Sequence, residues 1–161
     1  GFECDVRETK DKKFYIYHDM LYDGKLFKSF NSNEIICDTL ESVFKLNTNK
    51  IILLEIKDPF IDIDNLVETL IKYESKNIYV MSFYNTVIDK LNIKNKTYKV
   101  GILNYVLNTT EKHFKYDFIC ILRPLLNDKI IEFVKKNNKE LFVYGNYNNN
   151  FKYDFPYYIV D

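Results

Sequence analysis

Carboxylate side chains occur with strand spacing at two places in the sequence. Glu3 and Asp5 are two residues apart in a predicted strand, so both side chains point to the same face. Glu55 and Lys57 repeat this spacing at the end of a second predicted strand. Because α/β folds place their functional sites at the carboxyl ends of neighbouring parallel strands, these side chains are positioned to converge on one point.

The chemistry that this pattern favours is the binding of a hard divalent cation. Two carboxylates between apolar neighbours are costly to bury unless a cation or a positively charged side chain balances them. Oxygen donors without Cys or His suit Mg²⁺ or Ca²⁺ better than Zn²⁺. The sequence therefore predicts a Mg²⁺ or Ca²⁺ site formed by Glu3, Asp5 and Glu55. Spacing alone leaves open a simpler interpretation, in which these carboxylates form a solvated strand face or pair with Lys57.

Two further polar residues follow predicted strands. His18, beside Asp19, is a candidate acid or base because histidine exchanges a proton near neutral pH, although an exposed loop histidine is the alternative. Arg123 precedes Pro124 at the end of another strand, where a guanidinium could bind phosphate. For Arg123 the sequence favours the alternative, a role in tying down a loop.

The elements that must position these residues alternate between strand and helix patterns. Strand-like runs are found at residues 2–6, 14–17, 51–56, 77–82, 98–103, 117–122, 141–144 and 157–160. Apolar residues recur with helical spacing at residues 33–46, 62–75, 84–91 and 127–138, with Asn33 as the predicted N-cap of the first helix, and residues 146–154 are predicted to form a loop. Several strands are nearly continuous apolar runs, which is typical of parallel strands covered on both faces. The pattern predicts an α/β fold with a parallel sheet, open or closed.

Composition narrows the possible partners. The chain has 161 residues, of which 23 are Lys or Arg and 23 are Asp or Glu, so its formal net charge is zero. Zero net charge argues against a general nucleic-acid binder, which needs a positive excess. The longest apolar run, residues 118–122, is far too short for a transmembrane segment. With no secretory signal recognisable, we expect a single cytoplasmic domain over residues 1–161, although the first residue is Gly1 rather than Met, which leaves a preceding segment open.

The amino-acid composition carries information about the source genome and the redox environment of the protein, and little about its mechanism. Ala, Gln and Trp are absent while Asn, Lys, Ile, Tyr and Phe are abundant, which indicates an AT-rich genome. Cys4, Cys37 and Cys120 are odd in number and lack metal-ligand spacing. They are therefore predicted to be buried free thiols in a reducing compartment.

A more specific pattern occupies the first twenty residues. Glu3-Cys4-Asp5-Val6, followed by Thr9-Lys10-Asp11, a short excursion and His18-Asp19, resembles the glycerophosphodiester phosphodiesterase family. Later segments resemble the family's strands in the same order: Leu54-Glu55-Ile56-Lys57, Ser82-Phe83, Gly101-Ile102-Leu103 and Tyr158-Ile159-Val160-Asp161. Of these, the first twenty residues and Glu55 to Lys57 carry the specific part of the resemblance.

The resemblance implies a TIM-barrel-like (β/α)8 fold of the phospholipase C-like phosphodiesterase type, apparently without its first strand. It implies hydrolysis of glycerophosphodiesters to glycerol phosphate and an alcohol, with a glycerophosphodiester or a lysophospholipid-like small molecule as the partner. By motif, the residues that would do this are Glu3, Asp5 and Glu55 as ligands of Mg²⁺ or Ca²⁺, His18 as one of two acid–base histidines, and Lys57 as a phosphate contact. Tyr144 keeps the aromatic position of the family's Trp-Thr-x-Asn motif, but the Thr and Asn positions are not kept.

The chain also departs from the family pattern. The family begins with a strand carrying His-Arg-Gly, which has no counterpart from Gly1 onward, and His113 does not match that histidine by motif. A barrel of this type typically takes about 250 residues. We therefore expect seven of the eight barrel strands, with two open sheet edges through which a homo-oligomer could form. A protein that is only monomeric at high concentration would contradict that oligomer.

Three explanations of the departures stay open. The chain is a piece of a longer protein, a catalytically degenerate binding or interaction domain that keeps the carboxylates, or a minimal active form. A lyase that leaves a cyclic phosphate shares the same residue types, so the sequence does not separate lyase from hydrolase.

Overall fold

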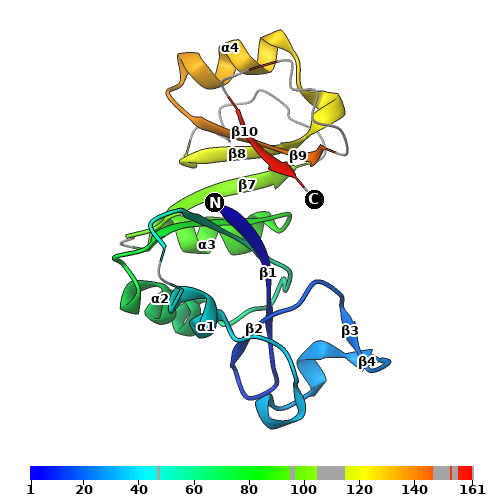
Figure 1. Ribbon diagram of the computed structural model, residues 1–161. Coiled ribbons are helices and arrows are strands. Elements are labelled where there is room, and N and C mark those ends of the chain that lie inside the picture. Colours follow the sequence, from blue (N-terminus) through cyan, green and yellow to red (C-terminus); the bar gives the residue numbers. More distant parts are fainter. Residues whose placement is uncertain (47, 95–96, 105–114, 147–152, 154–155, 161) are drawn as a thin grey trace.

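The computed structural model describes residues 1–46, 48–94, 97–104, 115–146, 153 and 156–160. Its main sheet has eight strands in the order β10-β9-β8-β7-β6-β5-β1-β2. These strands are β1 (Phe2–Glu8), β2 (Phe14–Ile16), β5 (Ile51–Ile56), β6 (Asn77–Ser82), β7 (Lys99–Asn104), β8 (Phe118–Leu122), β9 (Glu140–Asn146) and β10 (Tyr157–Val160). The α-helices among the described residues are α1 (Leu40–Phe44), α2 (Ile63–Lys72), α3 (Asn85–Ile93) and α4 (Asp128–Lys136). A small hairpin, β3 (Leu21–Tyr22) and β4 (Lys25–Leu26), projects from the sheet (Figure 1).

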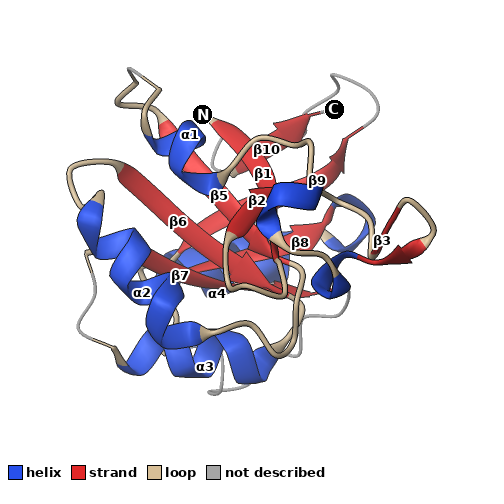
Figure 2. Ribbon diagram, turned by 90° about the horizontal axis from the view of Figure 1, so that it is seen from below, coloured by secondary structure: helices blue, strands red, loops and turns tan. Residues whose placement is uncertain are grey.

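Seven strands of the sheet, β1 and β5 to β10, run parallel, and β2 pairs with β1 in the antiparallel sense. The sheet curls into an open half-barrel with α2, α3 and α4 outside it (Figures 1 and 2). The predicted α/β fold with a parallel sheet is therefore confirmed. Each predicted strand is present, with ends within about two residues of those expected from the sequence.

The two faces of the sheet pack into separate cores. One core lies between the outer face and the helices and includes Val6, Ile52, Leu54 and Leu66. The other lines the inner face and is formed by Leu53, Tyr79, Met81, Leu103, Phe118, Cys120 and Phe142. Because side chains alternate along a strand, the residues next to those of the outer core point into the half-barrel.

Side-chain caps define where two helices begin. Asp62 accepts a hydrogen bond from the backbone N–H of Asn65 at the start of α2, and Asn127 accepts one from Ile130 at the start of α4. These caps agree with the starts predicted at residues 62 and 127, because a polar N-cap side chain satisfies an otherwise unpaired N–H. The predicted helix over residues 84–91 is α3.

The helix predicted over residues 33–46, with Asn33 as its N-cap, is wrong. The described residues there form only a 3-10 turn, η2 (Ser32–Glu34), and the short helix α1, whose N-cap is Thr39 with its side chain accepting from the N–H of Ser42. The backbone before Thr39 is held extended, because Ile16 donates to the carbonyl oxygen of Asp38. Pairing with β2 therefore outcompetes the helical pattern, and Ile36, expected on the buried face, is exposed.

Strands β1 and β10 approach each other without forming a sheet pair (Figures 1 and 2). β2 covers only Val6 to Glu8 of β1, so the first half of β1 and all of β10 border a groove of about 440 Å³. Glu3 and Leu53 form part of its lining. The half-barrel is thus open on this side, and self-association through its edges stays a prediction.

The structure bears on two sequence predictions, the burial of the three free cysteines and the lack of a transmembrane segment. All three cysteines are free thiols as predicted, but only Cys120 is fully buried, and Cys4 and Cys37 are half-buried. Among the helices in the described part of the chain, none is long and apolar enough to cross a membrane.

One glycine marks a close approach between strands. Gly101 in β7 pairs with Phe118 in β8, and a Cβ atom added at Gly101 would overlap the Phe118 ring. That ring has little room to move, since it packs against Tyr79 and Phe142 with ring centroids 5.4 and 5.0 Å away.

We expect Gly101→Ala to destabilise the protein by about 1–3 kcal/mol, the usual cost of overpacking a filled core. Urea unfolding followed by circular dichroism measures this change. Ser75→Ala, at an exposed position, is the control. An unchanged free energy of unfolding for Gly101→Ala would show that the inner core can repack.

Candidate active site

Three carboxylates meet on the inner face of β1 and β5. The parallel register places Asp5 opposite Glu55 and Glu3 opposite Leu53. One oxygen atom from each of Glu3, Asp5 and Glu55 lies within 4.8 Å of the others. The convergence expected from the strand spacing is therefore present, because alternate residues of two adjacent strands share one face.

Lys57 lies beside these carboxylates. Its Nζ is 2.7 Å from Glu55 Oε1 and 3.1 Å from Asp5 Oδ1. The pairing of these carboxylates with Lys57, which the sequence spacing left open as an alternative, is therefore present together with the carboxylate cluster. Three carboxylates facing one ammonium leave an excess of negative charge, which a divalent cation would balance.

The pKa values of Glu55 and Lys57 reflect their burial and the closeness of these charged groups. Burial raises the pKa of the Glu55 carboxyl above its ordinary value, and the hydrogen bond and charge of Lys57 offset burial only in part. Burial by itself lowers the pKa of Lys57, but Glu55 and Asp5 outweigh burial and the pKa is raised overall. Lys57 therefore stays protonated at neutral pH, while the charged form of Glu55 is less favourable than in water and gains from a bound cation.

The donor set fits a hard cation. All three candidate ligands offer carboxylate oxygens, the donors that Mg²⁺ and Ca²⁺ prefer. The nearby thiols are poor competitors, because burial raises the pKa of Cys4 to about 11 and that of Cys120 well above its ordinary value. Protonated thiols do not serve as metal ligands.

His18 follows β2 and precedes the β3–β4 hairpin. Its Nδ1 is 2.8 Å from Asp19 Oδ1, and both side chains are largely exposed. Since an ionised carboxylate only accepts hydrogen bonds, Nδ1 must carry a proton in this pair. Nε2 is then the ring atom available for exchanging a proton with a bound molecule.

The other predicted site residues lie at the same end of the sheet. Arg123 begins the 3-10 turn η4 (Arg123–Leu125) directly after β8, half-buried. Tyr144 lies near the end of β9, with its ring edge-to-face against Phe83 at a centroid distance of 6.4 Å. The carboxyl ends of β8, β9 and β6 therefore add the Arg123 guanidinium, the Tyr144 ring and the Phe83 ring to this end of the half-barrel. His113 lies outside the described residues.

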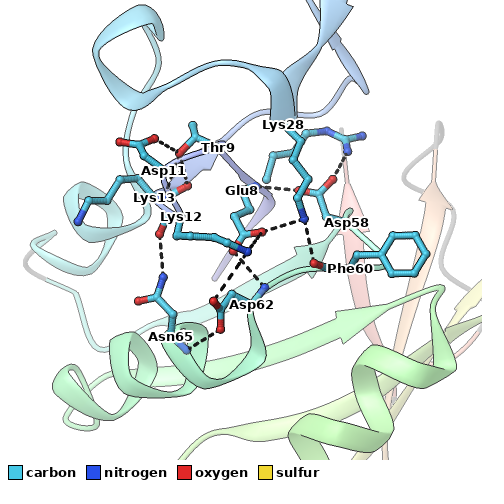
Figure 3. A network of polar contacts seen from close by, with 11 residues as sticks. Glu8, Thr9, Asp11, Lys12, Lys13, Lys28, Asp58, Phe60, Asp62 and Asn65 are labelled. Atoms are coloured by element: carbon cyan, nitrogen blue, oxygen red, sulfur yellow. Dashed lines mark hydrogen bonds and ion pairs between the residues drawn. The ribbon is translucent and has the colours of Figure 1, made fainter.

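A buried carboxylate anchors the loops behind the site (Figure 3). The side chain of Glu8 is fully buried, and its Oε1 accepts a hydrogen bond from the N–H of Asp62 at 3.0 Å. Its Oε2 is 3.0 Å from Lys28 Nζ, which also donates to the carbonyl oxygen of Phe60. These contacts tie the end of β1 to the segment between β5 and α2.

Two polar residues beside this network, Arg7 and Asp58, are not predicted from the sequence. Arg7 Nη1 lies 2.8 Å from Asp58 Oδ1, and two other nitrogen atoms of Arg7 donate to the carbonyl oxygen of His18. One signal was available, because Arg7 follows Asp5 by two residues and so shares its face of β1. The pairing with Asp58 depends on strand register and had no sequence signal.

Solved structures of known proteins share the fold of this chain. No family model and no curated protein matches the chain. Among solved structures, the chain is similar to a glycerophosphodiester phosphodiesterase from Agrobacterium tumefaciens, with a TM-score of 0.75, 19% identity and coverage of 98% of this chain and 82% of that one. A glycerophosphodiester phosphodiesterase from Parabacteroides distasonis is similar with a TM-score of 0.71, 22% identity and coverage of 89% and 69%.

A third similar structure is an Oleispira antarctica phosphodiesterase in complex with the product sn-glycerol-3-phosphate. Its TM-score is 0.77 at 14% identity, and the match covers 88% of this chain and 70% of that one. The chain thus spans between about two thirds and four fifths of the length of these structures. At these identities the likeness concerns the fold, and it agrees with the TIM-barrel-like architecture that the sequence motifs predict. The chain has the fold of the glycerophosphodiester phosphodiesterases.

Proposed function

We propose that this chain catalyses the cation-dependent hydrolysis of glycerophosphodiesters to glycerol phosphate and an alcohol. The observation that carries the proposal is the meeting of Glu3, Asp5 and Glu55 within 4.8 Å at the end of the half-barrel that also carries His18. The shared fold adds support, since solved structures of glycerophosphodiester phosphodiesterases have the same architecture. The complex of a third similar protein, the Oleispira antarctica phosphodiesterase, with the product sn-glycerol-3-phosphate supports a small phosphate-containing ligand.

The three carboxylates would hold Mg²⁺ or Ca²⁺. When bound, a divalent cation offsets the negative charge of the phosphodiester, which otherwise repels the attacking oxygen. Lys57 already contacts two of the carboxylates and supplies an ammonium that can bind a phosphate oxygen. Arg123 is proposed as a second phosphate contact and Tyr144 as an aromatic wall for the substrate.

His18 is proposed to handle the proton of the reaction. Hydrolysis forms a bond from a water oxygen to phosphorus and breaks the bond from phosphorus to the alcohol oxygen. The attacking water gives up one proton to the solvent, and the departing alkoxide takes one, which His18 can donate from Nε2 while Asp19 accepts the hydrogen bond from Nδ1. A hydroxyl of the substrate glycerol as the attacking group would instead give a cyclic phosphate.

The test is turnover with defined glycerophosphodiesters. Glycerophosphocholine and glycerophosphoethanolamine are incubated with the protein and Mg²⁺ or Ca²⁺, and phosphorus NMR identifies the products. We expect glycerol phosphate to accumulate with cation present and to stop accumulating when a chelator is added. A cyclic phosphate as the end product would replace the hydrolase proposal by a lyase.

One observation favours a second candidate function. His18 is the only histidine within the described ranges of the chain, whereas the family pattern uses two. A degenerate binding or interaction domain would keep the carboxylates and the cation but show no turnover. Absence of turnover with every cation, together with a melting temperature that glycerol phosphate raises, would support this candidate.

A further inference from the structure

Arg7 and Asp58 form a buried ion pair where β1 and β5 end. Arg7 is 7% and Asp58 is 8% exposed, and Nη1 of Arg7 lies 2.8 Å from Oδ1 of Asp58. The other oxygen of Asp58 accepts the backbone N–H of Glu8 at 2.7 Å, a contact drawn in Figure 3. A buried ion pair is favourable only when its remaining donors and acceptors also have hydrogen-bond partners. The partners of the other Arg7 nitrogen atoms therefore decide whether this pair is stable.

Those donors are directed at the backbone of His18. Nη2 and Nε of Arg7 donate to the carbonyl oxygen of His18 at 2.9 and 3.3 Å. One residue earlier, the N–H of Tyr17 donates to the carbonyl oxygen of Asp5 at 2.9 Å. The chain at His18 is therefore tied to β1 at two successive residues, and the second tie is made by the Arg7 side chain.

Packing does little to hold the His18 ring itself. Its side chain is 70% exposed, and Asp19, which it contacts, is 72% exposed. An exposed ring on a loop takes its position from its backbone, because few neighbouring atoms restrict it. The anchor on the His18 carbonyl is thus the contact that decides where the ring lies relative to the strand carboxylates.

We infer that Arg7 and Asp58 are a positioning pair for His18, an inference that rests on the proposed function. Asp58 fixes the plane of the guanidinium, and the guanidinium fixes the peptide between His18 and Asp19. Neither residue is assigned contact with substrate. Lysine cannot replace Arg7, because a single ammonium lacks the planar fork that reaches Asp58 and the His18 carbonyl together.

The kinetic test compares Arg7→Lys and Asp58→Asn with the parent protein. We expect kcat to fall about 10- to 100-fold, because a small misplacement of a reacting group lowers the rate by that order. KM and cation affinity should change by less than about twofold. Asp117→Asn is the matched control, since Asp117 also accepts a backbone N–H, that of Val100 at 2.7 Å, but lies at the opposite end of the strands. A parallel loss of kcat in Asp117→Asn would overturn the assignment.

A second measurement separates positioning from a general structural role. Arg7→Lys is combined with His18→Gln, and a positioning residue should then cause little further loss, since the group that it positions is gone. An equal fold-change in both backgrounds would contradict the inference.

A third measurement needs no turnover. The amide heteronuclear NOE of His18 and Asp19 should fall in Arg7→Lys and stay unchanged in Asp117→Asn, because this NOE reports fast backbone motion. Unchanged values in Arg7→Lys would overturn the positioning role even in an active enzyme. Failure of the parent protein to turn over any substrate would overturn the proposed function, and the NOE comparison would still decide whether Arg7 anchors this loop.

Discussion

Replacing Glu55 by glutamine is expected to weaken the binding of Mg²⁺ or Ca²⁺ at least about 100-fold, because the loss of outer-shell partners alone costs 10- to 100-fold in metal sites. Glutamine keeps the shape of the side chain but removes the charge of the carboxylate that shares the Lys57 ammonium with Asp5. Isothermal titration with each cation measures the affinity. Turnover of a glycerophosphodiester should fall with cation occupancy.

The same variant should remain folded. Since the pKa of Glu55 is raised above its ordinary value of 4.5, the cation-free protein loses stability as the pH rises from 4.5 through that raised pKa, and the loss is complete at higher pH. Glu55→Gln should therefore keep or raise the melting temperature at pH 7 without cation. Glu68→Gln, at an exposed position of α2, is the control and should change neither the affinity nor the melting temperature. An unchanged cation affinity in Glu55→Gln would remove Glu55 from the site.

The raised pKa also fixes the direction of the pH dependence. Protons compete with the cation for Glu55, and protonation begins at a higher pH than for an ordinary glutamate. Cation affinity should therefore decline as the pH falls, and the decline should begin at a higher pH than an ordinary glutamate would give. Titrations at a series of pH values check this, and in Glu55→Gln this part of the decline should be absent.

Replacing His18 by glutamine is expected to lower kcat by a factor of about 10²–10⁴, the usual contribution of a general acid or base. Cation affinity should stay within about twofold of that of the parent protein, because His18 is not among the three predicted ligands. Initial rates at saturating cation measure the loss. An acid–base role predicts a loss of kcat at unchanged cation affinity, whereas a role as a cation ligand predicts that cation affinity falls as well.

The sequence contains a matched control for this experiment. His113 is the only other histidine, and it does not match the family's histidine motif, so His113→Gln should retain the activity of the parent. Activity that survives in His18→Gln and disappears in His113→Gln would assign the acid–base role to His113 instead.

Local sequence was sufficient for most of the fold and for the candidate ligands. The apolar runs at residues 51–56 and 118–122 predict buried parallel strands, and both are central in the sheet. The two-residue spacing of Glu3 and Asp5 predicts their shared face, since alternation is a property of any strand. The motif that links them to Glu55 and His18 predicts the fold that the solved structures share.

Helix patterns were less reliable where a strand competed for the same residues. Residues 33–46 have helical periodicity, yet Asp38 and Thr39 pair with β2 and α1 is the only α-helix among them. The free energy of that pairing comes from residues more than twenty positions away in the sequence, which no local window contains. The same limit applies to Ile36, whose exposure contradicts its place in the helical pattern.

The contacts that give the site its electrostatics depend on the tertiary structure. Alternation places Asp5 and Glu55 on a face, but only the register of β1 against β5 brings them beside each other and beside Lys57. The partners of Arg7 are Asp58, 51 residues away, and the carbonyl oxygen of His18, 11 residues away. Composition and spacing can name charged residues, whereas their burial, their partners and their pKa values follow from which strands adjoin and which loops close over them.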